Sequence, residues 1–217
     1  MHVEIWSDVA CPWCYIGMRR FEVALARFEH RHGVEVTWRS FELDPGAPAA
    51  PEGDRVERLA RKYGTTRDVA EERQRQITEL AAADGLELRF ELVRDGNTFD
   101  AHRLLHLAAA HGIQDAVNER LFRARFAEGV LLSEHTELER LGAEAGLPAG
   151  EVGELLAENR FADAVRADER GAAELGITAV PFYVVDRRMG ASGAQPPEVF
   201  DQLLERGWDA RSPVSAS

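Results

Sequence analysis

Alternating apolar and polar positions predict a short strand at the start of the chain. In residues 2–7, Val3 and Ile5 alternate with polar neighbours, which is the period of a strand with one buried face. From Cys11 onward apolar side chains recur at close to helical spacing, charged side chains take the other face, and Gly33 ends the pattern. The apolar positions of this helix are Ile16, Phe21, Leu25 and Phe28. The pattern therefore predicts a strand followed directly by a helix, with Cys11 at the start of that helix.

A second strand is predicted for residues 34–43, where β-branched and aromatic side chains return. We expect it to pair parallel to the first strand through the intervening helix, as a β-α-β unit. The segment that follows, residues 44–54, is rich in alanine and glycine and contains Pro45, Pro48 and Pro51. This composition predicts a linker that leaves the β-α-β unit, so residues 1–44 form the first part of a domain.

Residues 55–175 are helical in pattern almost throughout, which marks a change in composition. Apolar positions at helical spacing include Val69, Ile77 and Leu80, then Ala101, Leu105 and Ala108, then Val117, Leu121 and Ala124, then Leu138, Leu141 and Ala145. Glycines separate these runs at intervals that suit short helix-to-helix connections. We therefore predict an inserted helical domain of about 120 residues.

The pattern changes again after Gly176. Residues 182–185 predict a strand, residues 188–192 predict its antiparallel partner, and Pro196 and Pro197 open a last helix. Residues 176–208 would then complete the first domain, and residues 209–217 would form a tail. The whole order is strand, helix, strand, helical insertion, strand, strand, helix. That order predicts an α/β protein with a thioredoxin fold and a large all-helical insertion.

Composition excludes several classes of partner. The chain has 26 basic and 38 acidic residues and a formal net charge of -12, which repels nucleic acid phosphates and anionic membrane surfaces. The first thirty residues carry charges and lack the apolar stretch of a secretory signal, and no apolar run of about 18 residues occurs elsewhere. We therefore expect a cytoplasmic protein that binds neither nucleic acid nor membrane.

Cys11 and Cys14 are the only two cysteines, and their spacing points to redox chemistry. A cysteine at the first turn of a helix faces unpaired N–H groups and the positive end of the helix dipole, and both favour the thiolate. The reactive cysteine of such pairs has a pKa of about 3.5 to 7.5, against about 8.5 for free cysteine. Cys14 lies almost one turn further on. We therefore predict that Cys11 attacks a substrate disulfide and that Cys14 resolves the mixed disulfide.

A zinc site is the alternative use of such a pair, and it needs two further ligands. The chain has no second cysteine pair, and His102 and His106, four residues apart on one helical face, have no third ligand nearby in sequence. We therefore predict no metal, and no organic cofactor, because electrons pass directly between sulfur atoms in disulfide exchange. The two histidines are expected at the solvated surface or in packing within the insertion.

Other residues are assigned to the walls of the site. Val180 and Pro181 precede the third strand, and a cis bond there would leave the Val180 backbone free to pair with a substrate. Pro12 and Trp13 lie between the cysteines, where Trp13 would be exposed to a substrate. Asp8 has two interpretations, proton transfer during resolution or an ordinary turn. A separate Asn97-Thr98 pair is expected to cap the following helix.

Three blocks together resemble a known family. They run from Ser7-Asp8 to Cys11-Pro12-Trp13-Cys14-Tyr15-Ile16-Gly17, from Asn97-Thr98 to Ala101-His102-Arg103-Leu104, and from Val180-Pro181-Phe182 to Ser192-Gly193-Ala194-Gln195. In this combination the chain resembles the DsbA-like FrnE oxidoreductases over nearly its whole length. The resemblance implies a thioredoxin domain with a helical insertion and thiol-disulfide oxidoreductase or isomerase activity.

Two other functions stay open. The kappa-class glutathione transferases and the 2-hydroxychromene-2-carboxylate isomerases are similar in architecture, but they have a Ser-Pro-Tyr-Ser type of block where this chain has Cys11 to Cys14. That difference favours dithiol chemistry, with a glutathione-dependent isomerase or transferase as the alternative. A non-enzymatic zinc-binding or interaction module is the second alternative. The sequence leaves open whether the substrate is a protein or a small molecule such as glutathione, and whether the chain is a monomer or a homodimer.

Overall fold

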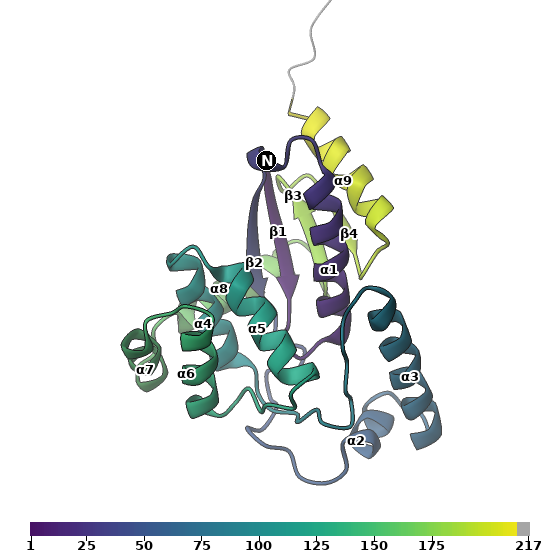
Figure 1. Ribbon diagram of the computed structural model, residues 1–217, viewed down its shortest axis with the longest axis vertical. Coiled ribbons are helices and arrows are strands. Elements are labelled where there is room, and N and C mark those ends of the chain that lie inside the picture. Colours follow the sequence, from purple (N-terminus) through teal and green to yellow (C-terminus); the bar gives the residue numbers. More distant parts are fainter. Residues whose placement is uncertain (212–217) are drawn as a thin grey trace, which may run out of the picture.

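A four-stranded sheet forms the centre of the computed structural model, which describes residues 1–211 (Figure 1). Its strands are β1 (His2–Ser7), β2 (Glu35–Ser40), β3 (Phe182–Val185) and β4 (Met189–Ser192), in the spatial order β2-β1-β3-β4. β1 pairs parallel with β2 and antiparallel with β3, and β3 pairs antiparallel with β4. These pairings confirm the predicted parallel first pair, the antiparallel last pair and the α/β thioredoxin fold.

Helices cover both faces of the sheet. α1 (Pro12–Arg27) and α9 (Pro197–Asp209) lie together on one face, as Figure 1 shows. Three aromatic rings pack these two helices against the sheet: Tyr183 of β3 lies 5.4 Å from Phe21 of α1 and 4.4 Å from Phe200 of α9, measured between ring centroids. On the opposite face, α8 (Ala162–Glu174) accepts a hydrogen bond from the Trp6 indole N–H at the Asp168 carbonyl, at 2.9 Å.

The other helices lie between β2 and β3 in sequence, as predicted for the insertion. They are α2 (Arg55–Lys62), α3 (Arg67–Ala83), α4 (Phe99–Ala110), α5 (Gln114–Phe126), α6 (His135–Glu144) and α7 (Ala149–Ala157), and a short 3-10 helix, η1 (Arg31–Gly33), precedes β2. Figure 1 shows α4 to α7 gathered on one side of the sheet, while α2 and α3 form a separate pair near the N-terminal end of α1. The Arg103 guanidinium of α4 donates to the carbonyls of Leu155, Glu158 and Arg160, which ties α4 to the end of α7.

Two element boundaries differ from the sequence prediction. β2 ends at Ser40 instead of continuing to residue 43, because the N–H of Leu43 donates to the Asp8 carboxylate at 2.8 Å and not to a neighbouring strand. α9 continues to Asp209, so the predicted tail from 209 begins inside the helix, and its residues 212–217 lie outside the described part of the chain. Across residues 1–211, no helix combines the length and apolar character that a membrane crossing requires.

Candidate active site

The two cysteines lie at the N-terminal end of α1, where the sequence predicts them. Cys11 is the N-cap residue and Pro12 occupies the first turn, a position at which the missing proline N–H costs no hydrogen bond. The Cys11 N–H donates to the Asp8 carbonyl at 2.9 Å, and the Cys14 N–H donates to the Cys11 carbonyl at 3.1 Å. Both cysteines are free thiols. The backbone therefore holds the pair on one tight turn that opens the helix.

The two thiols differ in environment. Cys11 retains 5% of its surface exposed, whereas Cys14 has none. Burial raises the pKa of the Cys14 thiol well above its ordinary value, the adjacent Cys11 sulfur raises it further, and the Asp8 N–H and the Ser7 hydroxyl oppose the shift. Cys14 therefore stays a protonated thiol as long as Cys11 carries no mixed disulfide. This suits a resolving cysteine that acts second.

The loop before β3 lies against Cys11. The Val180–Pro181 peptide bond is cis, as the sequence predicts, and the Cys11 Sγ lies 3.8 Å from the Val180 carbonyl oxygen. Pro181 is buried, while Val180 is half-buried. Trp13 is exposed to 39%, as expected of a side chain that faces a substrate. The structure thus brings together the residues that the sequence assigned to the site, which are Cys11, Cys14, Pro12, Trp13, Val180 and Pro181.

Asp8 is one half of a buried pair behind the cysteines. Its carboxylate accepts the N–H groups of Ala10 at 2.9 Å and Leu43 at 2.8 Å, and its Oδ1 lies 3.5 Å from Nε2 of His102 in α4. Both side chains are 1% exposed. Burial alone would raise the pKa of Asp8, but His102 and the two N–H groups outweigh burial, and the net effect lowers it. Asp8 is therefore a buried carboxylate, held in its charged form.

The expectation that these two histidines lie at the surface or pack within the insertion is wrong for His102 and confirmed for His106, which packs against α8. His102 contacts Asp8 of the thioredoxin domain, whereas the His106 Nε2 lies 3.1 Å from the Asp168 carboxylate on α8. The two histidine rings therefore contact different carboxylates and do not form one common site. Of the two predicted capping residues, Asn97 accepts the Phe99 N–H at the start of α4 with its side-chain oxygen at 2.8 Å, whereas Thr98, the N-cap residue, makes no side-chain capping hydrogen bond.

Sequence reasoning missed two polar groups near the site, Glu42 and the Tyr183 hydroxyl. Glu42, which is 5% exposed, follows β2 and accepts from Arg166 of α8. Burial raises the pKa of Glu42, although Arg166 counteracts the shift. The Tyr183 hydroxyl is buried without a hydrogen-bond partner among residues 1–211; burial raises its pKa, and the nearby Cys14 and Cys11 sulfurs raise it further. No local signal could have found these groups, because each depends on contacts between distant segments.

A cavity of about 320 Å³ opens beside Cys11. Its other wall is the α2–α3 pair, and most of its lining is apolar or aromatic: Pro12, Trp13, Leu43, Leu59, Tyr63, Ala70, Ile77 and Phe90, with Arg55, Thr65, Arg73 and Gln74 as polar members. Within residues 1–211, no group of three or more His, Cys, Asp or Glu side chains is arranged to hold a metal ion. The site therefore combines a thiol pair with an adjoining apolar cavity.

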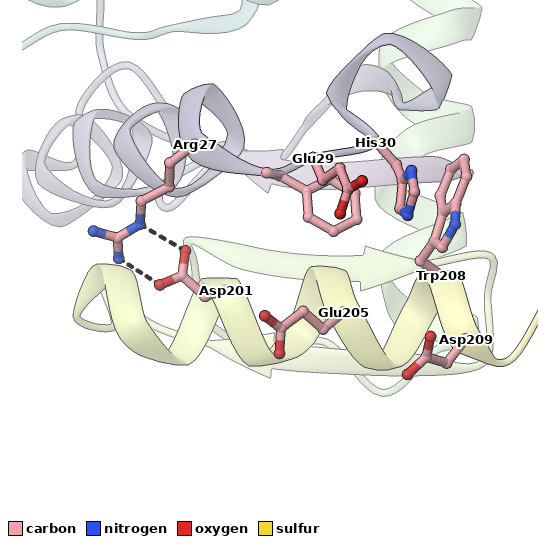
Figure 2. A pocket seen from close by; sticks show the side chains of 8 residues that line it. Arg27, Glu29, His30, Asp201, Glu205, Trp208 and Asp209 are labelled. Atoms are coloured by element: carbon pink, nitrogen blue, oxygen red, sulfur yellow. Dashed lines mark hydrogen bonds and ion pairs between the residues drawn. The ribbon is translucent and has the colours of Figure 1, made fainter.

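A second hollow of about 480 Å³ lies at the opposite end of α1. Figure 2 shows its lining, in which the His30 and Trp208 rings stack at 4.5 Å and Arg27 pairs with Asp201 of α9. Neither cysteine contributes to it. This hollow is therefore separate from the thiol chemistry.

The fold and the cysteine pair define a thioredoxin-fold protein with two free thiols at the start of α1. The family model for the DSBA-like thioredoxin domain matches residues 2–205, so the chain belongs to the DsbA-like thioredoxin domain family. This confirms the predicted family, and the FrnE subtype stays a prediction. The probable DsbA oxidoreductase of Streptomyces coelicolor is 48% identical, with a TM-score of 0.93 over 100% of this chain and 94% of that chain.

Two more distant relatives are informative. The uncharacterized protein YwbO of Bacillus subtilis (strain 168) is 28% identical over 206 residues, which cover 94% of this chain and 96% of that protein. The cytosolic disulfide reductase DsbM of Pseudomonas aeruginosa, solved with glutathione, is 19% identical with a TM-score of 0.69 over 96% of this chain and 100% of that chain. At that identity DsbM shares the fold.

Proposed function

We propose that the protein is a thiol-disulfide oxidoreductase that exchanges a dithiol for a disulfide through Cys11 and Cys14. The observation that supports this most is the arrangement of two free thiols on one helical turn, with the Cys11 Sγ 3.8 Å from the Val180 carbonyl and next to an open cavity. An attacking thiol needs access, and a resolving thiol needs to be close and protected. Cys11 and Cys14 meet these two requirements respectively.

The proposed reaction has two steps. The Cys11 thiolate attacks one sulfur of a substrate disulfide, forms a mixed disulfide and releases the first half of the substrate as a thiolate. Cys14 then loses its proton, its sulfur attacks Cys11 Sγ, and the second half of the substrate leaves as a thiol. The protein is oxidised by two electrons, the substrate is reduced by two, and the reverse sequence returns the protein to the dithiol.

We further propose that glutathione is one exchange partner and that the protein works in the cytoplasm. DsbM, which shares the fold, is a cytosolic disulfide reductase and was solved with glutathione. Cytoplasmic thiol pools keep protein dithiols reduced. Oxidase, reductase and isomerase activities differ in reduction potential, and a change of about 30 mV shifts a two-electron equilibrium tenfold.

An equilibrium redox titration in glutathione buffers tests this function. We expect one reversible two-electron transition, followed by thiol count and tryptophan fluorescence, that disappears in both Cys11→Ser and Cys14→Ser. Mass spectrometry should find a mixed disulfide with glutathione in Cys14→Ser and none in Cys11→Ser. The alternative function predicts no such transition. It predicts instead a glutathione-dependent isomerisation or conjugation that persists in Cys14→Ser, and this result would identify a glutathione-dependent isomerase or transferase.

A further inference from the structure

Two residues that line the cavity beside Cys11 carry buried hydrogen-bond donors without a partner in the described part of the chain. The Arg55 Nη1 of α2 and the Gln74 Nε2 of α3 are both buried, and neither has a hydrogen-bond partner within residues 1–211. Both residues line the same cavity as Cys11. A buried donor without a partner loses its hydrogen bond to water and gains none in return, so two such donors on residues of one cavity wall need an explanation. An acceptor on a bound molecule would remove this cost.

The Arg55 guanidinium is held in place on its other sides. Its Nε donates to the Asp95 carboxylate at 3.1 Å, and its Cζ lies 5.4 Å from the centroid of the Phe90 ring, which also lines the cavity. These contacts occupy one edge and one face of the guanidinium and leave Nη1 unpaired. Arg73, a further cation of the wall, is exposed and has no ion pair in the described part of the chain.

The charge of the wall contrasts with that of the protein. The chain has a formal net charge of -12, yet among the residues that line this cavity the only charged side chains are Arg55 and Arg73, and no carboxylate is among them. A local cation pair in an acidic protein attracts an anionic ligand. Its donors would bind a carboxylate, and the remaining wall would bind an apolar or aromatic group.

We propose that this cavity binds a small aromatic disulfide, or the thiol derived from it, that carries a carboxylate. The proposal rests on the thiol-disulfide exchange proposed above and names its substrate class. The carboxylate would lie at Arg55 and Gln74, the aromatic body against Leu59 and Phe90, and the sulfur at Cys11. The cavity volume of about 320 Å³ is at the lower end of the range of about 300–1,000 Å³ for small-molecule sites, which suits one half of such a disulfide.

The reaction then balances without another group. Cys11 forms a mixed disulfide with one half of the ligand and releases the other half as an aromatic thiolate. Cys14 loses its proton and displaces the bound half as a second thiolate, leaving the Cys11–Cys14 disulfide. One disulfide is reduced to two thiols, and one protein dithiol is oxidised.

Binding can be tested apart from the thiol chemistry. The probe is 2-nitrobenzoate, an aromatic carboxylate without sulfur, compared with uncharged 2-nitrobenzamide by isothermal titration calorimetry. We expect saturable binding of the carboxylate, and weakening of about tenfold or more in Arg55→Gln and in Gln74→Leu, since hydrogen bonds to charged groups are strong. Asp95 keeps Arg58 and Arg125 as partners, at 2.8 and 3.0 Å, when Arg55 is replaced.

The matched control is Arg75→Gln, which removes the same charge from α3. Arg75 is exposed, pairs with Glu72 at 2.5 Å and does not line this cavity. We expect Arg75→Gln to bind the probe as the parent does. Three outcomes would overturn the proposal: no saturable binding of 2-nitrobenzoate, equal affinity for the amide, or equal weakening by Arg75→Gln.

Stopped-flow kinetics then test the disulfide itself. Reduced protein is mixed with 5,5'-dithiobis(2-nitrobenzoate), which carries carboxylates, or with 4,4'-dithiodipyridine, which carries none. Arg55→Gln and Gln74→Leu should each lower the ratio of the first rate constant to the second by about tenfold. A ratio that stays unchanged in Arg55→Gln and in Gln74→Leu would overturn the substrate class, even if both disulfides still reacted with Cys11. Binding of 2-nitrobenzoate without any exchange at Cys11 would instead overturn the proposed function, and with it the assignment of the ligand as a disulfide.

Discussion

Gly17 of α1 has no room for a side chain, and replacing it tests how tightly α1 packs on the site. A Cβ atom at Gly17 would lie 2.6 Å from the Tyr183 hydroxyl oxygen, 3.0 Å from Pro181 Cγ and 3.4 Å from Ala194 Cα. Overpacking of this kind costs about 1–3 kcal/mol, against about 1 kcal/mol that alanine gains over glycine inside a helix. We therefore expect Gly17→Ala to lower the free energy of unfolding by up to about 2 kcal/mol.

The nearest of these contacts can be removed separately. Tyr183→Phe deletes the hydroxyl, which is buried and has no hydrogen-bond partner in residues 1–211, so this change leaves no group newly unpaired. We expect it alone to change stability little. In the double variant the alanine methyl gains the space of the hydroxyl, and most of the loss should be recovered. The double-mutant cycle should therefore give an interaction energy of about 1–2 kcal/mol.

Urea denaturation of the four proteins measures this cycle, with the slope used to check that the denatured state is unchanged. Gly153→Ala is the matched control, because it lies inside α7 and a Cβ there meets only Glu139 Oε1, at 3.7 Å. That control should gain up to about 1 kcal/mol. The reasoning is refuted if Gly17→Ala gains stability as the control does, or if the two changes add to within about 0.5 kcal/mol.

Three further predictions follow from the buried groups around the site. Asp8→Asn should cost about 1–3 kcal/mol at neutral pH, because the buried carboxylate accepts the Ala10 and Leu43 N–H groups and faces His102. The folded-state pKa of Asp8 is lowered, so this contribution is present above the ordinary carboxyl pKa of about 3.9 and is lost as pH falls. The difference from wild type should therefore shrink in urea titrations from about pH 5 to pH 3, and a constant difference would contradict it. Tyr15→Phe should lower the free energy of unfolding by about 1 kcal/mol in the same assay, because it removes the 2.8 Å hydrogen bond to Glu119 but keeps the stack on the Phe122 ring. An unchanged free energy of unfolding would show that this bond contributes nothing. Iodoacetamide should label Cys11 well before Cys14, because burial raises the pKa of Cys14; peptide mapping after a time course measures this, and equal labelling would contradict the assigned order.

Local pattern was enough to predict the elements that carry the cysteines. The alternation of Val3 and Ile5 and the helical spacing after Cys11 produce β1 and α1, since both elements bury one face on the same core. The end of β2 was not predictable, because it depends on a hydrogen bond from the Leu43 N–H to Asp8. Sequence spacing cannot show that a carboxylate replaces a neighbouring strand as the acceptor.

The same limit applies to the site. Helical spacing placed His102 and His106 on one face, but their rings contact Asp8 and Asp168, which belong to different segments. The partners of Arg55 are likewise set by the position of α2 against the loop at Asp95. Motifs therefore indicated which residues react, whereas tertiary packing determines which charges surround them.

Unpaired buried polar groups point to this region independently of the cysteines. Among residues 1–211, these groups include the Ser7 hydroxyl, the Tyr183 hydroxyl and the His102 Nδ1 near the cysteine pair, and the Arg55 and Gln74 donors of the adjoining cavity wall. Folded proteins rarely leave such groups unpaired, and they do so mainly where function requires it. Ser7, Tyr183 and the cysteines belong to the thioredoxin domain, while His102, Arg55 and Gln74 belong to the helical insertion. The insertion therefore contributes to the site from two directions, through a buried partner for Asp8 and through the donors of the cavity wall.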